Sequence, residues 1–251
     1  LRRYGISPDE FSRMLAARAE PDLVLITSIM TYWYRGAVEV SEIVRRAFPR
    51  AKIIVGGIYP TLCYDEALLN FKEADLIVPT TDIAAFYRFI EQGFGYALSF
   101  KPRLDDLDVL PYPAHDLLES IPFVPVLTSL GCVFRCTYCA TSYMYRKMVR
   151  RSPGSVLGEV AHWHDRGVER FVMYDDSFLY SSESFAKPLL RSIANLPYRV
   201  GIYNPNAVNA AFIDEEIAGL FVRSGFREVR IGLESIDPLV QSSTGGKVTR
   251  A

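Results

Sequence analysis

The chain has 251 residues, of which 49% are hydrophobic and 23% charged, and its formal net charge is −1. This composition is typical of a soluble globular protein, and the near-neutral charge gives no reason to expect a nucleic-acid or membrane partner. The sequence shows neither a secretory signal peptide nor an apolar run long enough to span a bilayer. Three of the four cysteines lie close together, which favours a reducing compartment over a disulfide framework, so we expect a cytoplasmic protein.

Residues 21–92 alternate short apolar runs with amphipathic segments. The apolar runs predict buried parallel strands, and the segments between them predict helices that cover the sheet. A leading helix is expected over 7–19, because Pro8 and two acidic residues occupy its first turn. The strands are expected at 22–28, 52–57 and 74–78, and the other helices at 38–48, 65–70 and 83–91.

Prolines punctuate residues 93–125. Proline fixes φ and lacks an amide donor, so this density disfavours both helix and sheet. We therefore predict a surface-packed linker at 96–121 between one domain at 1–95 and a second at 122–251. The chain begins without Met and ends after a strand-like segment and a turn, so we expect the first domain to be incomplete at its N-terminus and the second at its C-terminus.

A second series of strands and helices follows the linker, and each of its strands ends in polar residues. In parallel α/β architecture, ligands bind at the carboxyl ends of the strands. Four polar strand ends together indicate one shared site. The strands are expected at 126–129, 170–176, 198–204 and 228–234, and the helices at 155–166, 182–195 (interrupted or kinked near Pro188) and 214–224.

The first of these strands leads into a loop that carries Cys132, Cys136 and Cys139, with three and two residues between successive cysteines. Three thiolates on one short loop can hold three irons of a [4Fe–4S] cluster and leave the fourth iron open to a small molecule. A structural zinc site needs a fourth Cys or His at a regular offset, and none follows nearby. A zinc loop with a distant ligand, or three buried structural cysteines, are the alternatives.

This motif, with Tyr138 before the last cysteine, resembles that of the radical S-adenosylmethionine (radical SAM) superfamily. The resemblance implies a partial (β/α)6 barrel over about 122–251, with four of its six strands present, in which the open iron binds the amino and carboxylate groups of SAM. The second-strand motif is Tyr174-Asp175-Asp176 instead of the frequent Gly-Gly-Glu. The implied SAM contacts are Tyr138, near the adenine; Asp175, Asp176 and Ser177; Asn204; and Glu234 and Ser235.

The first half resembles the cobalamin-binding, Rossmann-like domain that precedes many radical SAM barrels. The matching segments are 21–28, 55–61 and 74–80, and glycines after a parallel strand allow close approach of a flat macrocycle or its nucleotide tail. The third strand runs into Pro79-Thr80-Thr81-Asp82, whereas the family usually has Gly-Glu-Gly-Glu, and no Asp-x-His-x-x-Gly is present. We therefore expect cobalamin to bind without a protein histidine on cobalt. The implied contacts are Thr27, Ser28, Gly56, Gly57 and Thr61.

Two further features are conspicuous. Cys63 follows the Gly56-Gly57 loop and is expected to be a small buried hydrophobe. The aromatic cluster at 31–34 follows the first strand, where core packing is the default expectation and contact with a corrin is the alternative.

We interpret the chain as a radical SAM enzyme with a [4Fe–4S] cluster, SAM and cobalamin, and C-methylation is one reaction open to it. The alternatives are a radical SAM enzyme without cobalamin, whose first domain recognises substrate, and a non-catalytic iron–sulfur or zinc scaffold. The expected partners are a small-molecule substrate and an electron donor, either a reductase or a flavodoxin or ferredoxin. We expect no nucleic-acid partner and no membrane partner.

Overall fold

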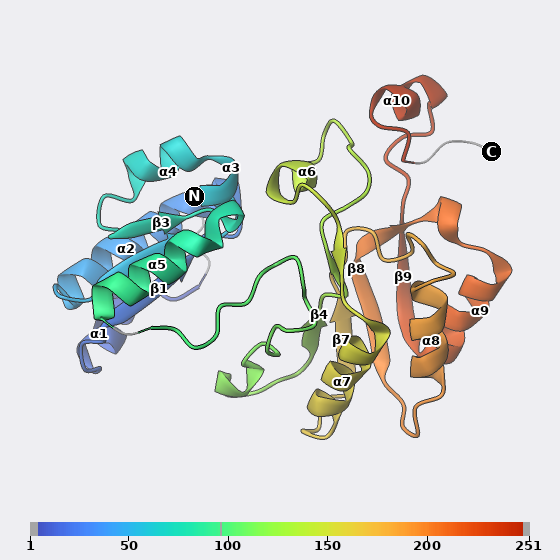
Figure 1. Cartoon of the computed structure of the whole chain (residues 1–251), viewed down its shortest axis with the longest axis horizontal. Helices are drawn as coiled ribbons and strands as arrows, with labels where there is room; N and C mark the ends of the chain where they lie inside the picture. The colour runs from blue at the N-terminus through green and yellow to red at the C-terminus, as the bar shows by residue number, and fades with distance from the viewer. Residues whose placement is uncertain (1–4, 96, 248–251) are drawn as a thin grey trace. The chain divides into compact units, whose positions relative to one another are not determined.

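The computed structural model describes residues 5–95 and 97–247 and divides the chain into two compact units, Leu1–Lys101 and Pro102–Ala251 (Figure 1). Each unit is an α/β fold built on a parallel sheet, as the alternation of apolar runs and amphipathic segments predicts. The fold class expected from the sequence is therefore confirmed.

The first unit contains a three-stranded parallel sheet in the order β1-β2-β3. The central strand is sealed, with Ile53 and Val55 fully buried, while Leu25 on the edge strand β1 is 61% exposed. Predicted strands and helices match those observed, except that a short helix at 58–62 was not expected. The elements are α1 (Pro8–Ala16), β1 (Leu23–Thr27), α2 (Tyr34–Ala47), β2 (Lys52–Gly56), α3 (Ile58–Leu62), α4 (Tyr64–Asn70), β3 (Leu76–Val78) and α5 (Ile83–Phe94).

One arginine ties the helix α2 to the amino ends of two strands. The Arg45 guanidinium donates to the carbonyl oxygens of Ala51 at 2.8 Å and Glu73 at 2.9 Å, and to the Asp75 carboxylate at 2.7 Å. The same carboxylate accepts from the Ile53 amide at 2.9 Å. Because these backbone groups would otherwise lack partners, the network fixes the amino end of the sheet and leaves its carboxyl end free for ligands.

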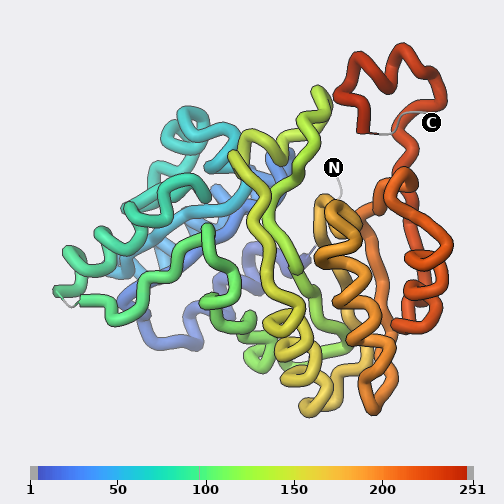
Figure 2. Tube along the Cα trace, turned by 45° about the vertical axis from the view of Figure 1, so that its right-hand side comes forward, coloured from blue at the N-terminus to red at the C-terminus, as the bar shows by residue number. Residues whose placement is uncertain are grey.

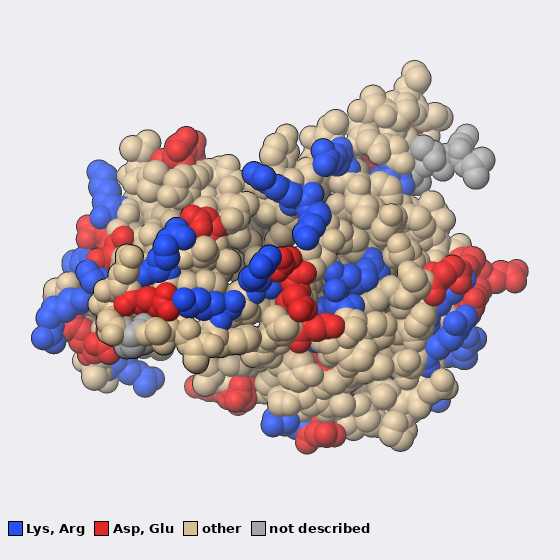
Figure 3. All heavy atoms as spheres, in the orientation of Figure 1, with Lys and Arg blue, Asp and Glu red and all other residues tan. Residues whose placement is uncertain are grey.

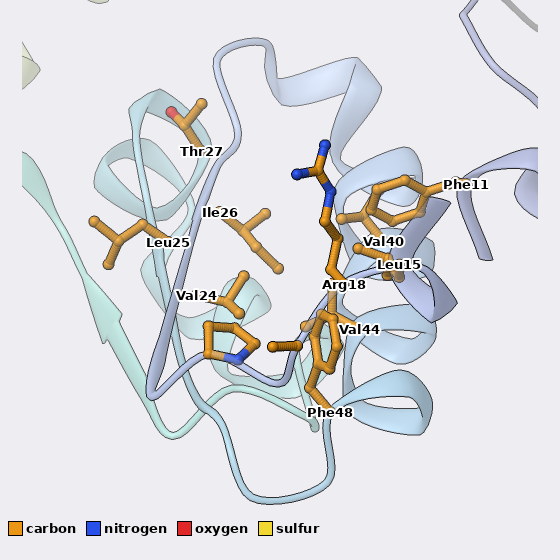
Figure 4. A pocket seen from close by; sticks show the side chains of 12 residues that line it. Phe11, Leu15, Arg18, Val24, Leu25, Ile26, Thr27, Val40, Val44 and Phe48 are labelled. Atoms are coloured by element: carbon orange, nitrogen blue, oxygen red, sulfur yellow. The ribbon is translucent and has the colours of Figure 1, made fainter. Parts of the chain in front are cut away.

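A cavity of about 500 Å³ lies in the first unit between α1, α2 and the edge strand β1 (Figure 4). Its walls are mainly aliphatic and aromatic, and they include Phe11, Val24 and Phe48. Figure 4 shows the polar ends of Arg18 and Thr27 beside these apolar groups. This lining contains few groups that could orient a polar ligand. We therefore interpret the cavity as incomplete packing beside the edge strand.

The second unit contains a four-stranded parallel sheet in the order β4-β7-β8-β9. Figures 1 and 2 show the chain rising from β9 into α10, beyond the carboxyl end of that strand. The elements are β4 (Val124–Val126), β5 (Ser129–Leu130), α6 (Thr141–Met144), β6 (Val149–Arg150), α7 (Pro153–His164), β7 (Arg170–Met173), α8 (Ala186–Ala194), β8 (Gly201–Asn209), α9 (Glu215–Ser224), β9 (Phe226–Gly232) and α10 (Pro238–Ser243).

Local signals explain where these helices begin. Ser152 caps α7 by accepting from the Ser155 amide, and Asp214 caps α9 by accepting from the Ile217 amide at 2.7 Å. The Asp214 carboxylate also lies 2.7 Å from Nζ of Lys187, a residue only 4% exposed on α8. This buried cation therefore joins the two helices through the cap of one of them.

Several expectations for the second unit are wrong in detail, including the strands predicted at 198–204 and 228–234, which are observed at Gly201–Asn209 and Phe226–Gly232. The strand predicted at 126–129 ends at Val126, because the chain then turns into an antiparallel β5–β6 hairpin that brackets the cysteine loop. The helix predicted at 182–195 begins at Ala186. Pro188 is thus in its first turn, where the missing amide has no intrahelical partner to lose, and it causes no interruption. The helix α10 was not predicted.

The surface of the chain shows no dominant charge on the face drawn in Figure 3, where Lys and Arg are interspersed with Asp and Glu. This agrees with the net charge of −1. None of the helices formed by the described residues is both long and apolar enough to cross a bilayer.

Candidate functional site

The cysteine loop is anchored to the sheet by a buried carboxylate. Asp175 Oδ1 accepts from the Thr128 amide at 3.1 Å, the Thr128 hydroxyl at 2.7 Å and the Ser129 hydroxyl at 2.6 Å. Burial, the largest cause, raises the pKa of Asp175, and the hydrogen bonds from Ser129 and Thr128 oppose that rise. The contact joins the end of β7 to the residues that immediately precede the cysteine loop.

The loop itself turns on a glycine that no other residue can replace without strain. Gly131 has a φ of +85°, and a Cβ at this position would lie 3.0 Å from the Lys147 carbonyl oxygen and 3.0 Å from Tyr145 Cβ. The segment that leads into β6 therefore packs directly against the start of the loop. Within the loop, the Cys139 amide donates to the Cys136 carbonyl at 3.0 Å.

All four cysteines are free thiols, and the three in the loop sit at the carboxyl end of the sheet. Cys136 is 7% exposed, while Cys132 and Cys139 are half-buried. Cys132 Sγ lies 4.0 Å from the Asp176 carbonyl oxygen, and Cys139 Sγ lies 3.3 Å from the Thr141 hydroxyl. Burial is the largest cause that raises the pKa of the Cys132 thiol.

Three free thiols on one short loop are the donor set of a [4Fe–4S] cluster in which each cysteine binds a different iron and one iron stays open. Among the residues that the structure describes, no group of three Cys, His, Asp or Glu side chains is arranged to hold a metal ion. The donor chemistry of this loop suits an iron–sulfur cluster.

A pocket of about 260 Å³ opens beside the cysteine loop. Tyr138 forms one wall and is 53% exposed, so its ring is available for stacking. Glu234 and Ser235 line it from the end of β9, and Lys247 lines it from the segment after α10. Glu234 has a φ of +57°, which is an unusual conformation for a non-glycine residue and is concentrated at functional sites.

Two residues predicted to contact SAM, Asp175 and Asn204, have buried side chains that bond to protein groups. Asp175 is 5% exposed, and its oxygens face Thr128 and Ser129. Asn204 is 4% exposed, donates to the carbonyl oxygens of Asn206 and Arg230, and accepts from the Arg230 amide. These bonds stabilise the irregular pairing of β8 with β9. Both side chains are therefore held by protein partners.

The remaining predicted SAM residues do lie near the cysteine loop. Ser177 is 9% exposed, and its side-chain hydrogen bond opposes the rise in the pKa of Cys132. Asp176 presents its carbonyl to Cys132, and burial followed by the charge of Asp175 raises the pKa of its carboxyl group. Sequence reasoning missed Lys247 and the contact of Thr244 and Gly245 with the cysteine loop, because residues in a turn carry no motif.

In the first unit, the five predicted cobalamin residues gather at the carboxyl ends of β1 and β2. The Ser28 amide donates to the Gly56 carbonyl at 2.9 Å, and the Thr61 hydroxyl donates to the Gly57 carbonyl at 2.7 Å. Gly57 has a φ of +104°, and a Cβ there would lie 2.9 Å from Thr27 Oγ1. Small residues and backbone thus form this edge of the sheet, and Gly57 permits the close approach of its two loops.

The aromatic cluster that follows β1 is divided between two roles. Tyr34 stacks on Tyr59 with ring centroids 4.6 Å apart, which is the core packing expected. Tyr32 and Trp33 are 70% and 65% exposed, so the expectation of core packing is wrong for them. Cys63 is half-buried and packs against the core of the unit.

The second unit carries three cysteines on one loop after the first strand of its parallel sheet, and a Rossmann-like unit precedes it. This combination is that of an α/β protein with an iron–sulfur loop and a second, cofactor-binding type of domain. The model of the radical SAM superfamily matches residues 126–251, and that of the B12 binding domain matches residues 3–86. The chain belongs to the radical SAM superfamily, in the group that carries a B12 binding domain. This membership implies a [4Fe–4S] cluster, SAM and cobalamin as cofactors.

Among curated proteins, the chain is similar to an uncharacterized methyltransferase of Pyrococcus horikoshii, with 25% identity over 92% of this chain and 55% of that protein. It is also similar to bacteriochlorophyllide d C-12(1)-methyltransferase of Chlorobaculum tepidum, with 29% identity over 88% of this chain and 50% of that protein. The chain thus spans about half the length of these relatives.

Solved structures with the same fold include the radical SAM methyltransferase TsrM from Kitasatospora setae, with cobalamin and a [4Fe–4S] cluster bound. The TM-score is 0.75 at 20% identity, covering 97% of this chain and 56% of TsrM. The cobalamin-dependent radical enzyme OxsB gives a TM-score of 0.67 at 15% identity, covering 98% of this chain and 40% of OxsB.

We predict that the Asp175 side chain acts as a structural acceptor. Asp175→Asn keeps an oxygen for the three donors, whereas Asp175→Leu leaves the Thr128 amide and two hydroxyls without it. The leucine variant should therefore lose about 2 kcal/mol more free energy of unfolding than the asparagine variant in urea titrations. Equal losses in the two variants would show that the donors do not depend on this oxygen.

We also predict that Gly245 is needed for a well-formed cysteine loop. Its φ is +116°, and a Cβ would lie 3.0 Å from Cys136 Cα and 3.2 Å from the Cys136 nitrogen. Gly245→Ala should lower the iron and sulfide bound after anaerobic reconstitution by about half or more, because the strain falls on a cluster-bearing residue. Gly167→Ala is the control, since Gly167 has a φ of +88° but open space around it. Equal iron content in the two variants would contradict the prediction.

Proposed function

We propose that the chain is the cofactor-bearing part of a cobalamin-dependent radical SAM methyltransferase that methylates carbon in a small-molecule substrate. One observation supports this proposal most strongly: the two units occur together in one chain. The second unit has the three-cysteine loop at the carboxyl end of its sheet, and the first, Rossmann-like unit has an edge formed by small residues. Methyltransferase relatives support the reaction class. The domain bounds proposed are 1–95 and 122–251, with a linker at 96–121.

The proposed cluster ligands are Cys132, Cys136 and Cys139. A cluster held by these cysteines would supply one-electron reduction of SAM, and cobalamin bound in the first unit would supply a transferable methyl group. Tyr138 stacks on the adenine, and the Asp176 carbonyl accepts a hydrogen bond from the SAM ammonium group. Ser177 supports Cys132, and Glu234 and Ser235 hold the ribose or methionine part from the end of β9.

In the first unit, the residues proposed to contact cobalamin are Thr27, Ser28, Gly56, Gly57 and Thr61. None of them offers an imidazole, so we propose that cobalamin binds here without a histidine on cobalt. The exposed Tyr32 and Trp33 follow the same strand end. Their apolar surface suits contact with a corrin.

The electron donor is proposed to be a reductase or a flavodoxin or ferredoxin, and the proposed compartment is the cytoplasm, where the cluster thiols stay reduced. The mixed charge on the face in Figure 3 supports a small-molecule substrate over a nucleic acid.

The function is tested by anaerobic reconstitution of the full-length protein with iron, sulfide and hydroxocobalamin, followed by desalting and an assay of 5′-deoxyadenosine from SAM and dithionite. Product together with retained corrin absorbance is expected. Product without corrin would contradict the cobalamin assignment and favour the cobalamin-free radical SAM enzyme. A formed cluster with neither product nor corrin would favour the scaffold.

Replacing any one cysteine of the loop should abolish the activity. Cys136→Ala removes one iron ligand, so we expect 5′-deoxyadenosine to fall to background and the iron content to drop. Cys63→Ala is the matched control, since Cys63 lies in the other unit and should leave both quantities unchanged. Retained cleavage in Cys136→Ala would refute the cluster assignment.

Cobalamin binding should depend on Gly57. A Cβ at this position would lie 2.7 Å from the Ser28 carbonyl oxygen and would push apart the two loops proposed to hold the cofactor. We expect Gly57→Ala to weaken hydroxocobalamin binding about tenfold, measured by corrin absorbance after equilibrium dialysis. Gly95→Ala, where φ is +73° and the surroundings are open, should bind normally. Equal affinity in both variants would argue against this edge as the site.

A further inference from the structure

The segment that follows the cysteine loop carries an exposed pair of cations. Arg146 and Lys147 lie between α6 and β6, and both side chains are exposed. Neither side chain forms a salt bridge or a hydrogen bond with another residue that the structure describes. In Figure 3, which has the orientation of Figure 1, Lys and Arg side chains gather over the region of α6. Both charges are therefore open to a partner in solution.

The backbone holds this pair against the cysteine loop. A Cβ added at Gly131 would lie 3.0 Å from the Lys147 carbonyl oxygen, so the segment before β6 packs on the start of the loop. A third exposed cation, Arg135, lies inside the loop, directly before Cys136. Positive charge is thus placed both within the loop that is proposed to bind the cluster and on the segment packed against it.

Exposed apolar side chains accompany these cations. Tyr143 on α6 is 78% exposed, and Val133 in the cysteine loop is 37% exposed. We call the set formed by Val133, Arg135, Tyr143, Arg146 and Lys147 the basic face. Complexes between electron-transfer proteins are weak and bury little surface, and complementary charge guides their formation. A small surface that combines cations with exposed apolar groups suits such a partner.

The proposed reaction gives this surface a reason to lie beside the cluster loop. An oxidised cluster needs one electron from outside the chain before it can reduce SAM. Cys132 and Cys139 are half-buried, so the loop lies close to the surface that a donor must reach. A carrier with acidic groups around its redox centre would be attracted to the basic face. A nucleic acid fits less well, because the rest of the face in Figure 3 carries both signs of charge.

We propose that the basic face docks an acidic one-electron carrier protein of the flavodoxin type, which reduces the cluster. The proposal rests on the function proposed above, which requires a reducible cluster on the loop. The step is a single electron transfer. The donor's reduced flavin loses one electron, the oxidised cluster gains it, and no covalent bond forms or breaks.

The test compares reduction of the cluster by two donors. Reconstituted full-length protein is mixed anaerobically with reduced flavodoxin or with photoreduced 5-deazariboflavin, an uncharged small reductant, and the loss of cluster absorbance is followed. The double variant Arg146→Glu/Lys147→Glu should react with flavodoxin about tenfold more slowly at low salt, because charge steers the association. The difference should disappear at about 1 M salt, where the Debye length is about 3 Å. The rate with deazariboflavin and the iron content should equal those of the unaltered protein.

Arg170→Glu/Arg227→Glu is the matched control. Both arginines are exposed and lie at the amino ends of β7 and β9, whereas the cysteine loop follows the carboxyl end of β4. This variant makes the same change in net charge away from the basic face, so flavodoxin should reduce it at the unaltered rate.

Three results would overturn the docking assignment while the proposed function stood. They are flavodoxin rates that fall equally in the two variants, an equal loss with deazariboflavin in Arg146→Glu/Lys147→Glu, and flavodoxin rates that fall in neither variant. In the last case, loss of binding to a mixed-sequence RNA hairpin would assign the basic face to nucleic acid. Failure of the unaltered protein to form a cluster that either donor reduces would overturn both proposals.

Discussion

The second unit depends on one buried interaction, the Asp175 carboxylate that joins the end of β7 to Thr128 and Ser129. A carboxyl group with almost no exposure is costly unless its oxygens have donors, and here three donors meet one oxygen. Those donors belong to the residues that lead into the cysteine loop. The position of the loop over the sheet is therefore fixed by a contact that forms only when β4 and β7 pair.

The rest of the site is built outward from that contact. The segment before β6 packs Lys147 and Tyr145 against Gly131, and the segment after α10 packs Gly245 against Cys136. Asn204 holds the irregular β8–β9 pairing from which Glu234 projects in a left-handed conformation. The left-handed Glu234 lines one pocket, and the tightly packed Gly245 follows another lining residue, Thr244. These features distinguish this pocket from the apolar cavity of the first unit.

Sequence patterns predicted the two α/β folds because buried parallel strands such as 52–57 are continuous apolar runs bounded by glycine or polar residues. The cysteine spacing likewise identified the loop and its chemistry. The sequence patterns did not predict features that are determined by tertiary contacts. Asp175 and Asn204 are polar residues at strand ends, like true ligand contacts, and only their packing reveals that they face other protein groups. Lys247 and α10 carry no periodicity or motif, so their place beside the loop follows from the fold alone.

The central claim is that three thiolates leave one iron of the cluster open for SAM. Electron paramagnetic resonance of the reduced, reconstituted protein tests it most directly, since the signal reports the ligands of the cluster. The account predicts a reduced [4Fe–4S] signal that changes when SAM is added, because the amino and carboxylate groups bind the open iron. A cluster signal that is identical with and without saturating SAM would contradict it.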